Sequence, residues 1–146
     1  MKITVIRQPD IPETEVTITC RELTGELNEI IAALSLIDNT VTGSAGDEIH
    51  FVPLRDVLYF ETVDGKTFFY TENATFETAA RLYQLEEKLA GTSFARISKS
   101  TIANLKKLRC IKAEKYSRLC ATLVTGEKLM VSRQYMDGIK QKLGVK

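Results

Sequence analysis

Residues 94–108 read F-A-R-I-S-K-S-T-I-A-N-L-K-K-L, a run in which apolar side chains alternate with basic and hydroxyl ones. Small hydroxyl groups beside cations suit an anion, because each donates hydrogen bonds without adding bulk, and phosphate is the most common such partner. The other interpretation is a polar loop that enters a short helix capped by Ser98 or Ser100. The stretch alone leaves both interpretations open.

Charge is divided unevenly along the 146 residues, although the net charge is only +1. Residues 1–90 hold seven Lys or Arg against sixteen Asp or Glu, whereas residues 91–146 hold thirteen against three. Opposite blocks of charge indicate a part that binds a polyanion beside an acidic part with another role. A dipolar protein whose halves attract each other is the alternative. Nucleic acid is therefore favoured as the partner of the second half.

The composition, 44% hydrophobic and 27% charged, is typical of one soluble globular domain, alone or with a small attached piece. Cys20, Cys110 and Cys120 have no metal-ligand spacing, so we expect reduced thiols, with Cys110 and Cys120 buried in one hairpin. No signal peptide or membrane-spanning run is visible, which predicts a cytoplasmic protein. No motif calls for a cofactor or a metal.

The first 46 residues are predicted to form a β-β-α segment and a linker. Residues 2–8 and 14–19 have strand patterns, and Thr19 with Glu22 has the spacing of a capping box. A helix should then run to Ile37, followed by a flexible linker at residues 39–46. The segment is acidic and too small to bury a core alone. We therefore expect it to mediate regulation or dimerisation rather than to bind DNA.

Residues 47–146 change to a pattern of short strands and form the second predicted domain. Asp64-Gly65 is a strong hairpin signal, because both positions of the turn favour positive φ. The predicted class is mostly β with peripheral helices, an α+β fold of small antiparallel sheets. Strands are expected at residues 49–53, 57–63, 66–71, 75–79, 108–113, 118–124 and 128–131, and helices at residues 81–90 and from Ser132 to about residue 143.

Arg133 is the sharpest single candidate for a functional residue. If Ser132 caps the last helix, Arg133 lies at the positive end of the helix dipole, which costs roughly 0.3–1 kcal/mol of stability. An anion bound at this end would offset that cost. The alternative is an arginine that leans towards a surface carboxylate. Lys66 and Thr67 follow the Asp64-Gly65 turn, where they would either enter a groove or remain solvated. Ser98, Lys99 and Ser100 lack a histidine partner and a nucleophile elbow, so an enzyme is not expected.

Three stretches together resemble the LytTR-type DNA-binding domain of bacterial transcription regulators. They are V-L-Y-F-E-T-V-D-G-K-T at residues 57–67, the stretch at residues 94–108, and L-M-V-S-R-Q-Y-M at residues 129–136. The resemblance implies that loops, rather than an inserted helix, hold double-stranded DNA. It places Lys66 with Thr67, Lys99, and Arg133 at successive major grooves. The residues expected at DNA are Lys66, Thr67, Ser98, Lys99, Ser100, Asn104, Lys106, Lys107 and Arg133, with Lys106 and Lys107 on phosphates.

The same resemblance suggests the partners. The chain looks like the standalone type that lacks a phospho-receiver domain, and some proteins of that type are restrained by a small membrane protein. We expect a homodimer on paired or direct-repeat DNA sites, and no small-molecule substrate. The alternative function is a non-enzymatic interaction module whose basic face binds an acidic protein or a membrane. The salt and sequence dependence of binding to duplex DNA distinguishes these functions.

Overall fold

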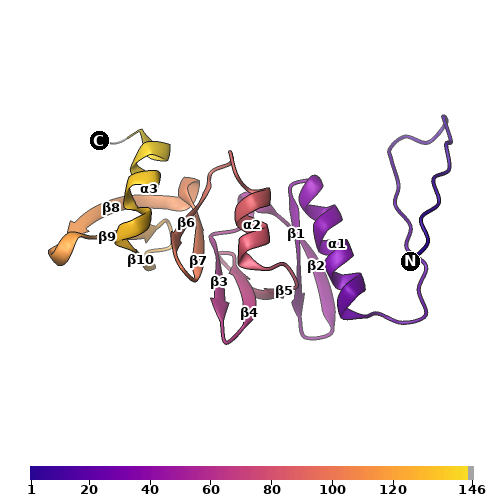
Figure 1. Ribbon diagram of the computed structural model, residues 1–146, viewed down its shortest axis with the longest axis horizontal. Helices are drawn as coiled ribbons and strands as arrows, with labels where there is room; N and C mark the ends of the chain where they lie inside the picture. Colours follow the sequence, from indigo (N-terminus) through magenta and orange to yellow (C-terminus); the bar gives the residue numbers. More distant parts are fainter. Residues whose placement is uncertain (145–146) are drawn as a thin grey trace.

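The computed structural model of the protein describes residues 1–144 and shows two antiparallel sheets side by side (Figure 1). The larger sheet has the strand order β2-β1-β5-β4-β3-β7-β6, and the smaller has the order β10-β9-β8. The predicted class, mostly β with peripheral helices, is confirmed. The strands are β1 Thr40–Ala45, β2 Glu48–Pro53, β3 Tyr59–Val63, β4 Lys66–Tyr70, β5 Thr75–Thr78, β6 Phe94–Ser98, β7 Thr101–Asn104, β8 Leu108–Glu114, β9 Arg118–Leu123 and β10 Lys128–Val131.

Helices lie against the sheets and between some of the strands. The α-helices are α1 Gly25–Ile37, α2 Leu82–Lys88 and α3 Met136–Leu143, and the 3-10 turns are η1 Leu54–Asp56, η2 Leu105–Lys107, η3 Lys115–Ser117 and η4 Arg133–Tyr135. The predicted helices at residues 81–90 and near the C-terminus are thus present. In the part of the chain that the structure describes, no helix combines the length and apolar character needed to cross a bilayer.

The β3–β4 hairpin forms as the sequence predicts. Asp64 and Gly65 have φ values of 51° and 78°, the left-handed region that a tight two-residue turn requires. The register then places Thr62 opposite Thr67 and Val63 opposite Lys66. Lys66 is consequently fixed as the first residue after the turn.

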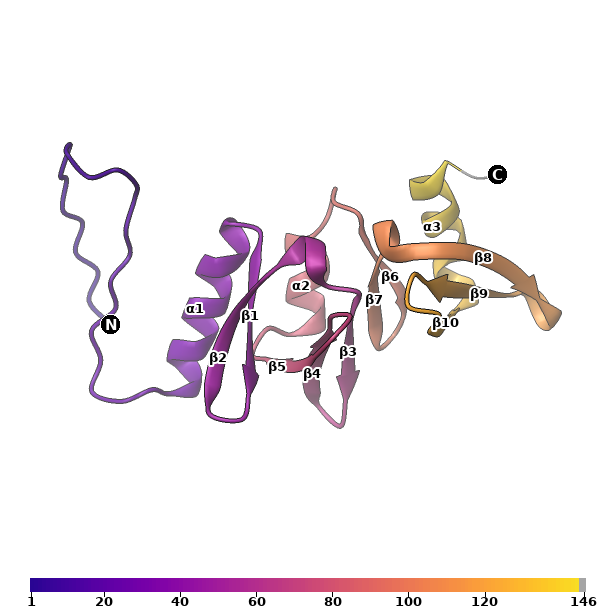
Figure 2. The same cartoon turned by 180° about the vertical axis from the view of Figure 1, so that it is seen from behind.

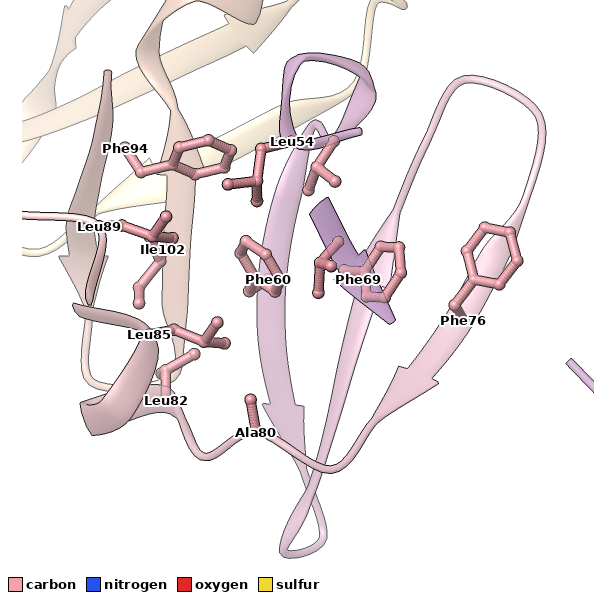
Figure 3. Packing of buried hydrophobic residues seen from close by; sticks show 12 residues of the cluster. Leu54, Phe60, Phe69, Phe76, Ala80, Leu82, Leu85, Leu89, Phe94 and Ile102 are labelled. Atoms are coloured by element: carbon pink, nitrogen blue, oxygen red, sulfur yellow. The ribbon is translucent and has the colours of Figure 1, made fainter. Parts of the chain in front are cut away.

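The core of the larger sheet is built from aromatic side chains of neighbouring strands. Phe60 and Phe69 are fully buried, with ring centres 5.7 Å apart, and Phe94 lies 5.7 Å from Phe60 on the other side. Figure 3 shows these rings with Leu82 and Leu85 of α2, which covers this face of the sheet. Burying each of these side chains stabilises the fold by about 1.5–3 kcal/mol, and this packing holds the strands that carry the turns.

The predicted N-terminal strands at residues 2–8 and 14–19 are wrong for this structure. Residues 1–24 contain no helix or strand and are exposed along their whole length. A strand needs a neighbour for its backbone N–H and C=O groups, and in this structure the segment pairs with no strand of residues 25–144. The capping box at Thr19 and Glu22 is also wrong. The helix begins at Gly25, and its cap is Thr24, whose Oγ1 accepts a hydrogen bond from Leu27 N at 3.2 Å.

The flexible linker predicted at residues 39–46 is wrong as well, because Thr40–Ala45 forms β1 inside the larger sheet. Gly43 shows why its composition misleads. A Cβ atom at this position would lie 2.5 Å from Phe76 Cβ and 2.6 Å from the Phe69 ring. Glycine is needed here so that β1 can pass over these two rings, and it does not mark flexibility.

The smaller sheet packs against the end of the larger one through a second apolar cluster, which includes Ile97, Leu123 and Ile139. Ser132 was expected to cap the last helix, but its side chain makes no capping bond. Its backbone N donates instead to Ile97 O at 2.8 Å, and the turn η4 precedes α3. Only one of the two hairpin thiols is buried: Cys120 is, whereas Cys110 is exposed on the outer face.

Candidate nucleic-acid interface

The β3–β4 and β6–β7 turns lie on the same border of the larger sheet, where the strands end, which is the lower border in both Figure 1 and Figure 2. Two backbone hydrogen bonds fix their arrangement with η4. Thr62 N in β3 donates to Ser100 O in the β6–β7 turn at 2.8 Å, and Ser132 N donates to Ile97 O in β6 at 2.8 Å. We call this row of the β3–β4 turn, the β6–β7 turn and η4 the turn edge.

Lys66 is the exposed cation of the first turn, whereas its neighbour Thr67 is buried, with 4% of its surface exposed. Thr67 lies inside the sheet, paired with Thr62 on one side and Thr78 on the other. Lys66 is therefore the side chain of this pair that can reach a ligand. Arg81 adds a second cation here, because its Nη1 donates to Gly65 O at 3.2 Å.

The β6–β7 turn presents Lys99 at its tip, between Ser98 and Ser100, and is held from behind by Arg96. The Arg96 guanidinium donates from Nε to Ser98 O at 2.8 Å and from Nη2 to Lys99 O. Its Nη1 lies 3.3 Å from Glu86 Oε1 in α2. Ser98 Oγ accepts from Ser100 N at 3.3 Å. The turn is thus braced on both sides, and Lys99 and Ser100 are exposed.

Asn104, although expected at DNA, is 2% exposed and has a role inside the fold. Its Nδ2 donates to Val57 O at 3.0 Å, and its Oδ1 accepts from Ser93 Oγ at 2.8 Å and from Lys106 N at 3.1 Å. These bonds tie the end of β7 to the backbone just before β3, to the Ser93 side chain and to the backbone of η2. The arrangement leaves Asn104 no surface for a DNA contact.

Lys106 and Lys107 lie in η2, at the opposite end of β7 from Ser100. Four strand residues span about 13 Å, so these lysines are well separated from the turn edge. Lys106 is exposed and Lys107 is half-buried. The structure therefore does not bring them together with Lys66, Lys99 and Arg133.

Arg133 begins η4 and is exposed next to the β8–β9 hairpin. Its Nη2 donates to Tyr116 O at 3.5 Å, at the limit for a hydrogen bond. A shallow recess surrounds it, lined by Tyr116, Arg118, Met130, Val131, Ser132 and Arg133. The alternative that Arg133 pairs with a surface carboxylate finds no support among residues 1–144, where its side chain makes no ion pair.

Sequence reasoning missed Arg81 and Arg96 as parts of this edge. Arg96 stands in the stretch quoted above, but its role depends on the fold. Only in a hairpin does its guanidinium turn back onto the carbonyls of the tip. Its position two residues before the Ser98-Lys99-Ser100 tip is the feature of the sequence that could have indicated this role. Arg81 gave no signal, because sixteen residues separate it from Gly65.

Two tyrosines fix the junction between the sheets behind the edge. Tyr59 Oη in β3 donates to Glu127 Oε2, next to β10, at 2.8 Å, and Tyr70 Oη donates to Glu61 Oε1 at 2.9 Å. The rings stack with centres 4.4 Å apart. Burial, followed by the hydrogen bond to Glu127 and its charge, raises the pKa of Tyr59 far above its usual range. Burial and the bond to Glu61 raise the pKa of Tyr70 to about 12.

Comparison with known proteins identifies the class of domain to which these small antiparallel sheets belong. The sequence profile of the LytTr DNA-binding domain matches residues 47–144. The chain therefore belongs to the LytTR DNA-binding domain family. The resemblance inferred from the three stretches is confirmed.

Similar proteins are known from Staphylococcus aureus and Bacillus cereus. Uncharacterized HTH-type transcriptional regulators of S. aureus strains COL and MRSA252 are 28% and 27% identical over 147 residues, covering 99% of both chains. A B. cereus structure, described as a LytTr DNA-binding domain, has 29% identity and a TM-score of 0.69, and covers 73% of this chain and 97% of that one. Within residues 1–144, strands separate α1, α2 and α3, so none of these helices forms a helix-turn-helix unit.

Proposed function

We propose that this protein is a cytoplasmic, sequence-specific transcription regulator that binds double-stranded DNA through the turn edge and catalyses no reaction. One observation carries the proposal: three turns, each with an exposed cation, share one edge of a rigid pair of sheets. The cations are Lys66, Lys99 and Arg133. Its membership of the LytTR family and the regulators similar to it over their full length support the proposal.

The cations of the turn edge suit two kinds of DNA contact, one with phosphates and one with bases. Lysines on flexible stems suit phosphates, and this contact releases counterions without regard to sequence. Arg133 can offer two parallel N–H donors to O6 and N7 of guanine, the most common specific contact in a major groove. Ser98 and Ser100 add small donors beside Lys99. Thr67, Asn104, Lys106 and Lys107 are left out of the proposed contacts, the first two because they are buried and the lysines because of their position.

The proposed partners follow from the size of the edge. One copy offers three turns, which suits a short site, so we expect two copies on paired or direct-repeat sites. We also propose that a small membrane protein restrains the regulator, by contacting the part of the chain that precedes the LytTr domain. Charge favours this division, since residues 1–48 hold nine acidic side chains against three basic ones.

The test is selection of duplexes from a random pool by the full chain, followed by titration of the selected and a scrambled duplex at several salt concentrations. The expected result is an enriched motif and a log–log salt slope of about −0.9 for each phosphate neutralised. Lys106→Ala is the matched control for Lys99→Ala, because both lysines are exposed and only Lys99 lies on the turn edge. A flat salt response with no enriched motif would favour the acidic-protein or membrane-binding module.

A further inference from the structure

The strand β2 forms one end of the larger sheet, so only one of its sides is paired. β1 pairs with that side over six residues, from Glu48 to Pro53. Ile49 and Phe51, which point to the same face of this strand, are 40% and 63% exposed. An open edge of this length, carrying apolar side chains, is a template for an added strand.

The chain itself contains a segment that fits this edge. We call residues 1–24 the N-terminal arm; it has no helix or strand of its own. Within it, residues 2–8 and 14–19 have strand-like sequences of seven and six residues, against six in β2. Ile3, Val5 and Val16 are 80%, 83% and 65% exposed. The arm thus has the β-forming side chains of a strand and lacks a partner.

The exposed area of the chain is larger than its mass predicts. The surface of one copy is 10510 Å². A folded monomer of 16.4 kDa is expected to expose about 7,500 Å², so this chain exposes about 3,000 Å² more. A stable interface buries about 800 Å² on each partner, well within this excess. Figures 1 and 2 show the source, an arm that extends past α1 and β2 away from the sheets.

Charge and the neighbouring helix point the same way. An antiparallel pairing of residues 2–8 with β2 brings Arg7 near Glu48, and charges of opposite sign across a strand pair are favourable. Ile37, the last residue of α1, is 76% exposed, and Leu23 of the arm itself is 66% exposed, so apolar surface remains uncovered on both sides of the proposed interface.

We propose that the N-terminal arm of one copy adds as an antiparallel strand to the open edge of β2 in a second copy, and that the exchange is reciprocal. The inference rests on the homodimer proposed above and gives its interface. A two-fold axis lets each copy supply one arm and one edge, so both open edges are closed at once. The arm is then folded only in the dimer, which explains why strand-like residues lie unpaired in a single chain.

Sedimentation of the full chain and of two variants at one position tests the exchange. Val5→Pro removes a backbone donor from the proposed strand, whereas Val5→Thr keeps both the donor and the strand preference. The natural chain and Val5→Thr should sediment at twice 16.4 kDa at micromolar concentration. Val5→Pro should weaken the dimer at least about tenfold. Its thermal unfolding at low concentration should be unchanged, because Val5 lies outside the sheets.

A thiol crosslinking experiment identifies which chain the arm meets. Copies with Thr4→Cys, which lies opposite Phe51 when Arg7 pairs with Glu48, are mixed with tagged copies carrying Phe51→Cys, both with the exposed Cys20 and Cys110 replaced by Ser. A crosslink between the two copies is expected. A crosslink seen only within one chain that carries both changes would overturn the proposal, because the arm would then cover its own β2. A dimer that resists Val5→Pro, or a chain that stays monomeric throughout, would overturn it too.

DNA binding provides a separate readout. Val5→Pro should bind a duplex with a single site as tightly as the natural chain does, since the arm is remote from the turn edge. Its affinity for a paired site should fall. If the natural chain bound no duplex at all, the proposed function would be contradicted. The sedimentation and crosslinking results would still test the exchange of the arm.

Discussion

In the proposed function, sequence specificity rests on Arg133. Its side chain is exposed, and within residues 1–144 its one hydrogen bond, to Tyr116 O, is 3.5 Å long. A guanidinium held so loosely can exchange this bond for a pair of bonds to guanine at little cost. Lysine, a point charge on a flexible stem, cannot reproduce the paired geometry.

Arg133→Ala should cost about 1–3 kcal/mol of affinity at the selected site and leave binding to a scrambled duplex nearly unchanged. Arg133→Lys should behave similarly, because charge alone does not read a base. Fluorescence titration of both duplexes at fixed salt gives the ratio of affinities. An unchanged ratio would make Arg133 an ordinary surface charge.

Asn104 shows the opposite case, a polar residue of the same stretch that serves the fold. Asn104→Ala removes the side-chain partner of Val57 O, Ser93 Oγ and Lys106 N, of which the bond to Val57 O is buried. We therefore expect the free energy of unfolding to fall by about 1–3 kcal/mol. Urea denaturation measures this loss. Binding per folded molecule should be preserved, and a selective loss of DNA affinity at full stability would contradict the structural role.

At the scale of the element, Arg96 holds the tip of the β6–β7 hairpin, which presents Lys99. Arg96→Lys keeps the charge but cannot hold Ser98 O, Lys99 O and Glu86 together. We expect about tenfold weaker binding to the selected duplex with an unchanged salt slope, and faster amide exchange at Ser100. A fall in the salt slope by about one unit would instead mean that Arg96 touches a phosphate itself.

Local signals predict elements whose partners are close in the chain and fail where the partner is distant. Asp64-Gly65 specifies its hairpin by backbone geometry alone, and that prediction is confirmed. Gly43 looks like part of a linker because its contacts, Phe69 and Phe76, follow much later in the sequence. Residues 2–8 have a strand pattern but no partner within one chain.

The candidate site divides in the same way. Lys66, Lys99 and Arg133 could be chosen from motifs because each lies in or next to a turn. Burial is a property of the sheet, so the sequence could not show that Thr67 and Asn104 are enclosed. The separation of Lys106 and Lys107 from the edge likewise depends on the direction of β7.

At the scale of the whole molecule, two tyrosines with raised pKa values, the buried Tyr59 and the half-buried Tyr70, give stability a pH dependence. The folded state binds the phenolic protons of Tyr59 and Tyr70 more tightly than the unfolded state, where the pKa is about 10. Stability should therefore be full below pH 10 and fall as the pH rises from about 10 towards 12. Urea denaturation across this range measures the decline, which should be shallower in Tyr59→Phe. An equal decline in both proteins would assign the effect to other groups.

Amide hydrogen exchange of the full chain, with and without the selected duplex, tests most directly whether the turn edge binds DNA. We expect the duplex to slow amide exchange at residues 64–66, 98–100 and 132–134 and to leave exchange in η2 and at the open edge of β2 unchanged. A scrambled duplex at the same salt should give weaker protection at the same three places. Protection centred on Lys106 and Lys107, with none at the three turns, would contradict the proposal.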